Sequence, residues 1–211
     1  MDRLPSTQKA ITPYSAYHGD LTSFNYWLFD AIAPYLQGRV LEMGSDLTTI
    51  SSVFAQHGNK IHLSTPNKLV QDQLREKYKG VDTVRMIHSI DPRHPNFEQF
   101  YNHNFRVFDT ILVLNAMEDG FFDDNVILNS INLLTVRGRL ILLAPAYTAV
   151  YNDILEDLKC LKKYNRQKIR NMISNKMEML KTYYFNLSST FASKPYCHAG
   201  LSVIAIAQKT E

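Results

Sequence analysis

Residues 107–115 read VFDTILVLN, and this stretch decides the fold. It is almost continuously apolar and rich in β-branched residues, which is typical of a central strand covered on both faces. Four shorter apolar runs share this character, at residues 39–43 (RVLEM), 60–64 (KIHLS), 83–88 (TVRMIH) and 139–144 (RLILLA). Buried strands at such intervals, with helical segments between them, predict a parallel sheet built from βα units.

The segments between these strands have helical apolar spacing. A helix is predicted over residues 21–38, and Pro34 is expected to distort only its last turn. Asp46 or Thr48 is expected to cap a helix that runs through residues 47–54 and ends near residue 58. Further helical segments are predicted at residues 67–79, 95–101, 123–134 and 149–175, the last broken near Asn165.

Two late strands, at residues 177–185 and 201–207, have no clear helix between them and are predicted to form an antiparallel edge pair. The expected fold is therefore α/β: a three-layer, doubly wound sheet, mostly parallel with an antiparallel C-terminal strand. Residues 1–20 read as an extended N-terminal arm, and residues 21–211 as one domain.

The composition of the chain argues against several classes of function. The 211 residues include 23 Lys and Arg against 20 Asp and Glu, a formal charge of +3, which is too mild to indicate nucleic acid or an anionic membrane. Cys160 and Cys197 do not make a disulfide framework, and neither they nor the seven histidines have the spacing of metal ligands. No apolar run is long enough to span a bilayer and the N-terminus lacks a signal peptide, so a cytoplasmic protein is expected.

In an open parallel sheet, ligands bind beyond the carboxyl ends of the strands, beside the first strand. A small-molecule site is therefore expected among the residues that follow each strand: 42–46, 64–67, 88–91, 115–119 and 145–147. His88 lies in this set, where it would serve either as a base or, more ordinarily, as a hydrogen-bonded loop histidine. The expected partner is a small-molecule ligand or a protein, with oligomerisation left open.

Three motifs resemble those of the class I S-adenosylmethionine-dependent methyltransferases. VLEMGS, at residues 40–45, resembles the first cofactor loop, and FDTILVLNAMED, at 108–119, resembles the fourth strand and the loop after it. LLTVRGRLILLAPA, at 133–146, resembles the fifth strand. The resemblance covers about residues 23–208 and implies a Rossmann-like methyltransferase fold. It also implies a shell for S-adenosylmethionine made of Glu42, Gly44, Ser45, Asp46, Thr65, Asp91 (or Ser89), Asn115 and Met117.

The sequence departs from the family pattern at two cofactor positions. The family loop has three glycines, of which only Gly44 remains, because Asp46 and Thr48 (or Leu47) stand at the later positions. The acid that holds the ribose hydroxyls aligns with Thr65, which offers one hydroxyl in place of two charge-assisted acceptors. The loss of that acid is expected to weaken binding by about 2–4 kcal/mol.

Two hypotheses therefore stay open. The first is an active methyltransferase that acts on a small molecule. The second is a pseudo-methyltransferase, in which the fold is retained as a binding or scaffolding subunit, or as a repurposed enzyme, without methyl transfer. Asp91 also has two interpretations, because before Pro92 it would either contact adenine or form an Asx turn.

Overall fold

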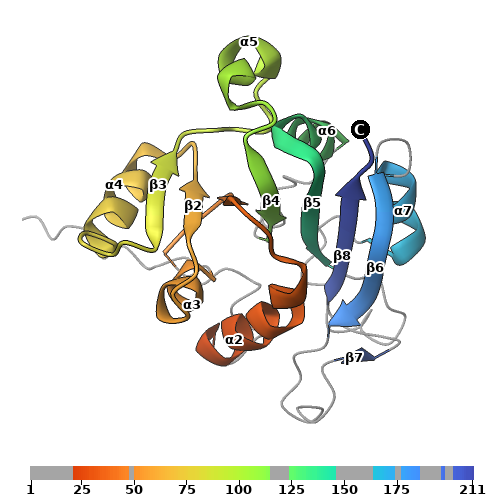
Figure 1. Cartoon of the computed structure of the whole chain (residues 1–211), viewed down its shortest axis with the longest axis horizontal. Coiled ribbons are helices and arrows are strands. Elements are labelled where there is room, and N and C mark those ends of the chain that lie inside the picture. The colour runs from red at the N-terminus through yellow and green to blue at the C-terminus, as the bar shows by residue number, and fades with distance from the viewer. Residues whose placement is uncertain are drawn as a thin grey trace, which may run out of the picture.

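The computed structural model describes residues 21–47, 50–114, 124–145, 164–173, 177–185, 196–197 and 202–211. Within this part of the chain, the strands form one sheet in the order β3-β2-β1-β4-β5-β8-β6-β7 (Figure 1). The strands are β1 (Val40–Met43), β2 (Ile61–Ser64), β3 (Val84–His88), β4 (Phe108–Val113), β5 (Leu134–Pro145), β6 (Met177–Phe185), β7 (Tyr196–Cys197) and β8 (Ser202–Lys209).

Short helices connect the strands. They are α2 (Leu21–Ile32), α3 (Ser51–Gln56), α4 (Lys68–Lys77), α5 (Phe97–Tyr101), α6 (Asp124–Leu133) and α7 (Arg166–Ile173), with 3-10 turns η1 (Ala33–Tyr35) and η2 (Asn102–Asn104). Figure 1 shows α4 beside β3 at one end of the sheet and α7 beside β6 at the other. The prediction that Pro34 distorts only the end of the first helix is confirmed, because Pro34 lies in η1.

The central strand is β1, which pairs in parallel with β2 on one side and with β4 on the other. β3 and β5 extend the parallel sheet outward, and β8 then pairs antiparallel with both β5 and β6. The predicted α/β fold, mostly parallel with antiparallel C-terminal strands, is confirmed. β2 and β3 lie on one side of β1, whereas β4 and β5 lie on the other, so the order of the strands changes direction at β1. The carboxyl ends of β1, β2 and β4 therefore meet at the switch point where ligands bind in such folds.

The predicted antiparallel pairing of the two late strands is confirmed, because β6 pairs antiparallel with β8, but the prediction that both lie at the edge of the sheet is wrong. β8 lies between β5 and β6. Each residue from Ser202 to Ala207 is buried, so this strand is covered on both faces and has a neighbour on each side. A strand that is apolar throughout is typical of the interior of a sheet.

Alternate residues of the strands enter two separate cores, one on each face. Leu41, Met43 and Ile111 pack on the face that also holds apolar residues of α5, α6 and α7. Val40 and Leu112 point to the opposite face, with apolar residues of α2, α3 and α4. This alternation produces three layers, with helices on both sides of the sheet.

Two local predictions are corrected. α3 begins at Ser51 with Ile50 at its N-cap position and no side-chain cap, so Asp46 does not cap it; Thr48 lies outside the described residues. β5 begins at Leu134 rather than near residue 139, because Leu134 pairs with Phe108 before a register shift.

The predicted break near Asn165 is consistent with the start of α7 at Arg166, where the Asn165 side chain accepts from the backbone N–H of Lys168 at 2.7 Å. The arm at residues 1–20 and the predicted helical residues 149–163 lie outside the described residues. In the described part of the chain, every helix is too short or too polar to cross a membrane.

Candidate functional site

The turn after β1 is formed by Gly44 and Ser45 at the carboxyl end of the central strand. The backbone N–H groups of both residues donate to the carbonyl oxygen of Ser64, each at 2.9 Å, which fastens the turn to β2. Gly44 has φ +77, a conformation that favours glycine, and a Cβ placed there would meet no described atom within 4 Å. The turn therefore has the backbone shape that its glycine predicts, with open space above it.

Glu42 and Ser45 brace this turn from within. Glu42 is 1% exposed, and the Ser45 hydroxyl donates to its backbone carbonyl oxygen at 3.0 Å and lies 3.4 Å from its carboxylate. A charged group in so buried a place needs internal hydrogen bonds. Asp46 follows in the same turn and is partly buried. Glu42, Gly44, Ser45 and Asp46 thus lie together at the end of β1, and their contact with a cofactor stays a prediction.

Thr65 lies directly after β2, beside this turn, in the position predicted for the ribose contact. It is 5% exposed, its N–H donates to the carbonyl of His88 at 3.1 Å, and its hydroxyl oxygen accepts from the backbone N–H of Asn67 at 3.4 Å. Asn67 in turn caps α4 by accepting from Leu69 and Val70. The Thr65 hydroxyl is therefore part of the turn that begins α4, and any ribose contact by it stays a prediction.

Asp91 lies in the loop after β3, and its carboxylate is already bonded to Arg93. Oδ1 accepts from the Arg93 backbone N–H at 2.9 Å and from Nε at 3.1 Å, and Oδ2 lies 3.4 Å from the guanidinium. The Asx turn, one of the two interpretations of this residue, is observed; its contact with adenine stays a prediction. Asn115 and Met117, the other predicted cofactor residues, lie outside the described residues.

The loop that carries Asp91 is held on two sides. The Tyr101 hydroxyl donates to the carbonyl of Ser89 at 3.2 Å and accepts from the Asp91 N–H at 3.3 Å. The Ser64 hydroxyl donates to the carbonyl of Ile90 at 3.0 Å. Residues 89–91 are thus fastened to both α5 and β2, a role for Tyr101 that the sequence does not reveal.

His88 is paired with a second histidine across the neighbouring strand. Its Nε2 lies 3.1 Å from Nδ1 of His62, and the two half-buried rings stack. Burial, His88, Arg39 and Arg85 lower the pKa of His62 to about 4. Burial lowers the pKa of His88 as well, with smaller effects from His103 and Arg39. The pairing favours the ordinary interpretation of His88 as a hydrogen-bonded histidine.

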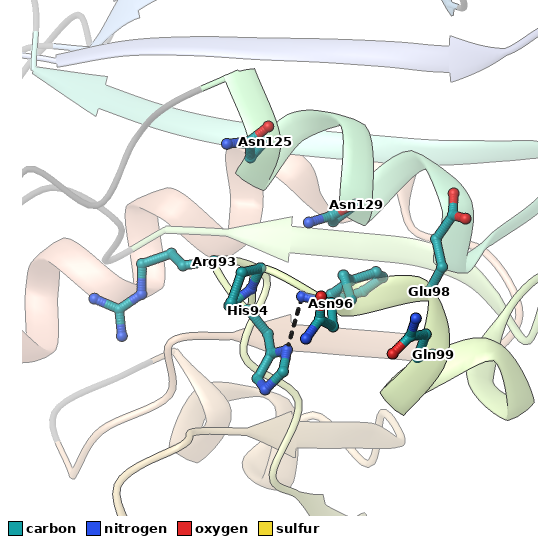
Figure 2. Close-up of a pocket in the computed structure, with 9 residues that line it drawn as sticks. Arg93, His94, Asn96, Glu98, Gln99, Asn125 and Asn129 are labelled. Atoms are coloured by element: carbon teal, nitrogen blue, oxygen red, sulfur yellow. Dashed lines mark hydrogen bonds between the residues drawn. The ribbon is translucent and has the colours of Figure 1, made fainter.

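A cavity of about 390 Å³ opens beyond the carboxyl end of β3, between segment 93–99 and the first turns of α6 (Figure 2). Asn125 and Asn129 line it from α6, four residues apart and so on one face of the helix. The Asn129 amide donates to the carbonyl of Pro92 at 2.7 Å, which ties α6 to the loop after β3.

The sequence does not single out these cavity residues, because polar side chains on a short helix and in a turn are typical of an ordinary solvated surface. The i, i+4 spacing of Asn125 and Asn129 is a signal that could have indicated them. No three His, Cys, Asp or Glu side chains among the described residues lie where they could share a metal ion.

The sequence and the fold of this chain give different results when they are compared with known proteins. No family model matches the sequence, and no curated protein is similar to it. Solved structures, in contrast, match along most of the chain. An S-adenosylmethionine-dependent methyltransferase of Thermotoga maritima superimposes with a TM-score of 0.67 over 96% of each chain, at 13% identity. This chain has the class I methyltransferase fold.

Two further methyltransferase structures agree. The magnesium protoporphyrin IX methyltransferase of Synechocystis, solved with S-adenosylhomocysteine bound, matches with a TM-score of 0.60 at 16% identity and covers 99% of this chain and 89% of its own. A methyltransferase of Methanosarcina mazei gives a TM-score of 0.60 at 13% identity, over 85% of this chain and 96% of its own. Since the identities are this low, the likeness establishes the fold and leaves the chemistry to the residues of the site.

Proposed function

We propose that this protein binds S-adenosylmethionine at the carboxyl ends of β1, β2 and β3 and transfers its methyl group to a small-molecule acceptor. The observation that carries the proposal is the Gly44 turn at φ +77, which lies at the switch point of a sheet with the methyltransferase strand order. Several similar solved structures are methyltransferases, and one of them holds S-adenosylhomocysteine.

The residues around this turn fit the cofactor in part. The open space above Gly44 admits a ligand against the backbone, and a Cβ there would project into it. Glu42, Gly44, Ser45 and Asp46 would surround the methionine part, and Thr65 would reach the ribose. Asp91 would contact the adenine, while Asn115 and Met117 belong to the loop after β4. The bound cofactor supplies an electrophilic methyl group on a sulfonium ion.

The chain's own residues hold the two loops of the site in place and orient the acceptor. The two bonds from Gly44 and Ser45 to Ser64, and those from Tyr101 and Ser64 to residues 89–91, fix both loops before any ligand binds. Loops fixed in advance lose less conformational entropy on binding, and alignment of the acceptor with the methyl group provides most of the rate in such a transfer. The absence of a strong catalytic motif is compatible with this chemistry.

A second candidate is a pseudo-methyltransferase that uses the fold as a binding or scaffolding subunit, or for a reaction other than methylation. Two observations favour it. Thr65 replaces the ribose acid, and its hydroxyl already accepts from Asn67. Asp46 adds a partly buried carboxylate to the turn, near the place expected for the carboxylate of the cofactor itself. Like charges at close range disfavour binding.

Calorimetric titration with S-adenosylmethionine and S-adenosylhomocysteine separates the candidates. If the proposal holds, the wild-type protein binds both ligands, and Thr65→Asp tightens binding by about tenfold to a hundredfold by restoring charge-assisted acceptors. Asn59→Asp is the matched control, because Asn59 is exposed and precedes the opposite, amino end of β2. It adds the same charge and is expected to leave the affinity unchanged.

The alternative predicts a different pattern. The wild-type protein would produce no heat at about millimolar ligand, and binding would appear only when Asp46→Gly is combined with Thr65→Asp. Wild-type binding without methylation of any acceptor would also favour a repurposed role. If neither the wild-type protein nor the variant with Asp46→Gly and Thr65→Asp binds a ligand, and both are folded, the assignment of the cofactor site to this turn is contradicted.

A further inference from the structure

The cavity between segment 93–99 and α6 is a different site from the turn at Gly44, and its lining indicates a ligand of its own. Its volume of about 390 Å³ is in the range of small-molecule sites. The walls come from two elements that Asn129 joins through its bond to the carbonyl of Pro92, so the cavity has a fixed shape at its base.

The charged side chains that line the cavity differ in where they point. Arg93 lines it, but its guanidinium is bonded to the Asp91 carboxylate at 3.1 Å and points away from the middle of the cavity in Figure 2. Glu98 extends toward α6 from the opposite wall (Figure 2). Among the described lining residues, Glu98 thus places a carboxylate at the exposed rim of the cavity with no guanidinium turned toward it, which favours a positive ligand over a negative one.

The neutral groups suit the same ligand. Asn125 and Asn129 present carboxamide groups, whose oxygens accept hydrogen bonds from N–H donors. Pro95 and Phe97 add apolar surface, and Phe97 is only 3% exposed. An ammonium group has three donors for the oxygens, and a short aliphatic chain can pack on the apolar wall.

We propose that this cavity binds a small organic cation, a primary amine on a short aliphatic chain. The ammonium group lies between the Glu98 carboxylate and the carboxamide oxygen of Asn129, which is the nearer of the two asparagines in Figure 2, and the methylene groups contact Pro95 and Phe97. Because Glu98 is exposed and an exposed ion pair contributes little by itself, the affinity is modest, with a Kd of about 1 mM.

The test is a titration of the whole protein with 1,4-diaminobutane, followed by NMR of the side-chain amides of Asn125 and Asn129. Saturable shifts of these signals are expected, and Glu98→Gln is expected to weaken binding about tenfold. Glu76→Gln is the matched control: this carboxylate lies on α4, is 81% exposed, and its removal leaves binding unchanged.

The uncharged analogue 1,4-butanediol decides the ligand class. If the diol binds as well as the diamine, or if Glu98→Gln binds the diamine as tightly as the wild type, the cavity does not select a cation and the proposal is overturned. Absence of any shift up to about 20 mM diamine overturns it too. Both substitutions are at exposed positions, so loss of folding does not obscure the result.

Discussion

Nδ1 of His62 lies 3.1 Å from Nε2 of His88, so a hydrogen bond joins the two imidazoles across the neighbouring strands β2 and β3. The rings stack at a centroid distance of 5.4 Å, and Phe108 meets each of them edge to face. Burial is the largest cause of the lowered pKa of both rings, and Arg39 acts on both of them, with Arg85 acting on His62. If both rings were protonated, each nitrogen would be a donor and the bond would be lost.

This pair predicts a loss of stability in acid. The pKa of His62 falls from 6.5 to about 4 on folding, and that of His88 is also lowered, so the unfolded chain binds protons more readily. The contribution of the histidine pair to the free energy of unfolding is complete above pH 6.5 and is lost as the pH falls from 6.5 to about 4. Because the rings are only half-buried and water screens part of the effect, we expect a loss of about 1–2 kcal/mol.

Urea denaturation between pH 7.5 and pH 4.5 measures this effect. His62→Gln is expected to reduce the difference in unfolding free energy between the two pH values. The control, His57→Gln, removes an exposed imidazole that bonds to the carbonyl of Val53 and stacks on Phe29, far from the His62–His88 pair in the sequence, and should leave the difference as in the wild type. An unchanged pH dependence in His62→Gln would show that the pair does not titrate on unfolding.

Gly38 is predicted to tolerate no larger residue, because a Cβ there would overlap the carboxylate of Asp109. That carboxylate accepts from the Arg39 N–H at 2.8 Å and from the Thr135 hydroxyl at 2.9 Å, so it cannot move without loss of both bonds. Gly38 also has φ +51. We expect Gly38→Ala to lower the free energy of unfolding by about 2–4 kcal/mol, from overlap and backbone strain together.

Gly58→Ala measures the backbone strain alone, without the overlap that Gly38→Ala adds. Gly58 has φ +69, but a Cβ there meets no described atom within 4 Å. The expected loss is about 1–2 kcal/mol, measured by the same thermal or urea denaturation. Equal losses in the two variants would mean that Asp109 moves aside freely and that its bonds to the start of β1 contribute little.

The fold could be predicted from the sequence because its signals are local. The run VFDTILVLN identified β4, and the bounds of residues 177–185 agree with those of β6, since apolar content and turn residues mark such strands directly. The place of β8 between β5 and β6 could not be predicted in the same way. It depends on pairing across the chain, and the local pattern of residues 201–207 indicates only a buried strand.

The site was predicted only as far as its backbone. Gly44 indicated its own turn because few other residues adopt φ +77. The sequence did not show that the Asp91 carboxylate is bonded to Arg93, or that Tyr101 spans Ser89 and Asp91, since these bonds join loops that meet only in the folded chain. The polar residues of the cavity are hard to recognise in the sequence, because solvent and a ligand select the same side chains, and only the i, i+4 spacing of Asn125 and Asn129 places two of them on one helix face.

Lys209 is predicted to stabilise α6 from the end of β8. Its ammonium group donates to the carbonyl oxygens of Ile131 and Leu134, each at 2.9 Å, and the residue is 8% exposed. A cation at a helix C-terminus complements the unpaired carbonyls of its last turn. Lys209→Met retains the aliphatic stem but leaves two buried acceptors without this donor, and we expect a loss of about 2–3 kcal/mol in unfolding free energy.

Lys60→Met is the comparison for that measurement, because Lys60 is exposed just before β2. Its effect on the unfolding free energy, measured by urea denaturation, should be under about 0.5 kcal/mol. If Lys209→Met is as mild as Lys60→Met, water replaces the ammonium group at the end of α6 and the cap is unimportant.

Tyr101 is predicted to act as a positioning residue for the loop that carries Asp91. Its hydroxyl bonds to both Ser89 and Asp91, and its ring packs on Phe97 at 5.0 Å, so the loop is held against a fixed aromatic group. Tyr101→Phe removes both bonds and keeps the ring. We expect a small loss of stability, about 1 kcal/mol, and a five- to tenfold weaker affinity for S-adenosylhomocysteine, because the free loop must be ordered on binding.

The two effects of Tyr101→Phe are separable by experiment. Calorimetry measures the affinity, in the Thr65→Asp background if the wild-type protein binds too weakly, and urea denaturation measures the stability. Tyr184→Phe, on β6 beside Arg166, is the matched control and should change neither the affinity nor the loop. A purely structural role would lower stability in Tyr101→Phe and leave the affinity unaltered. An affinity loss with stability nearly intact would show that the hydroxyl works through the order of residues 89–91.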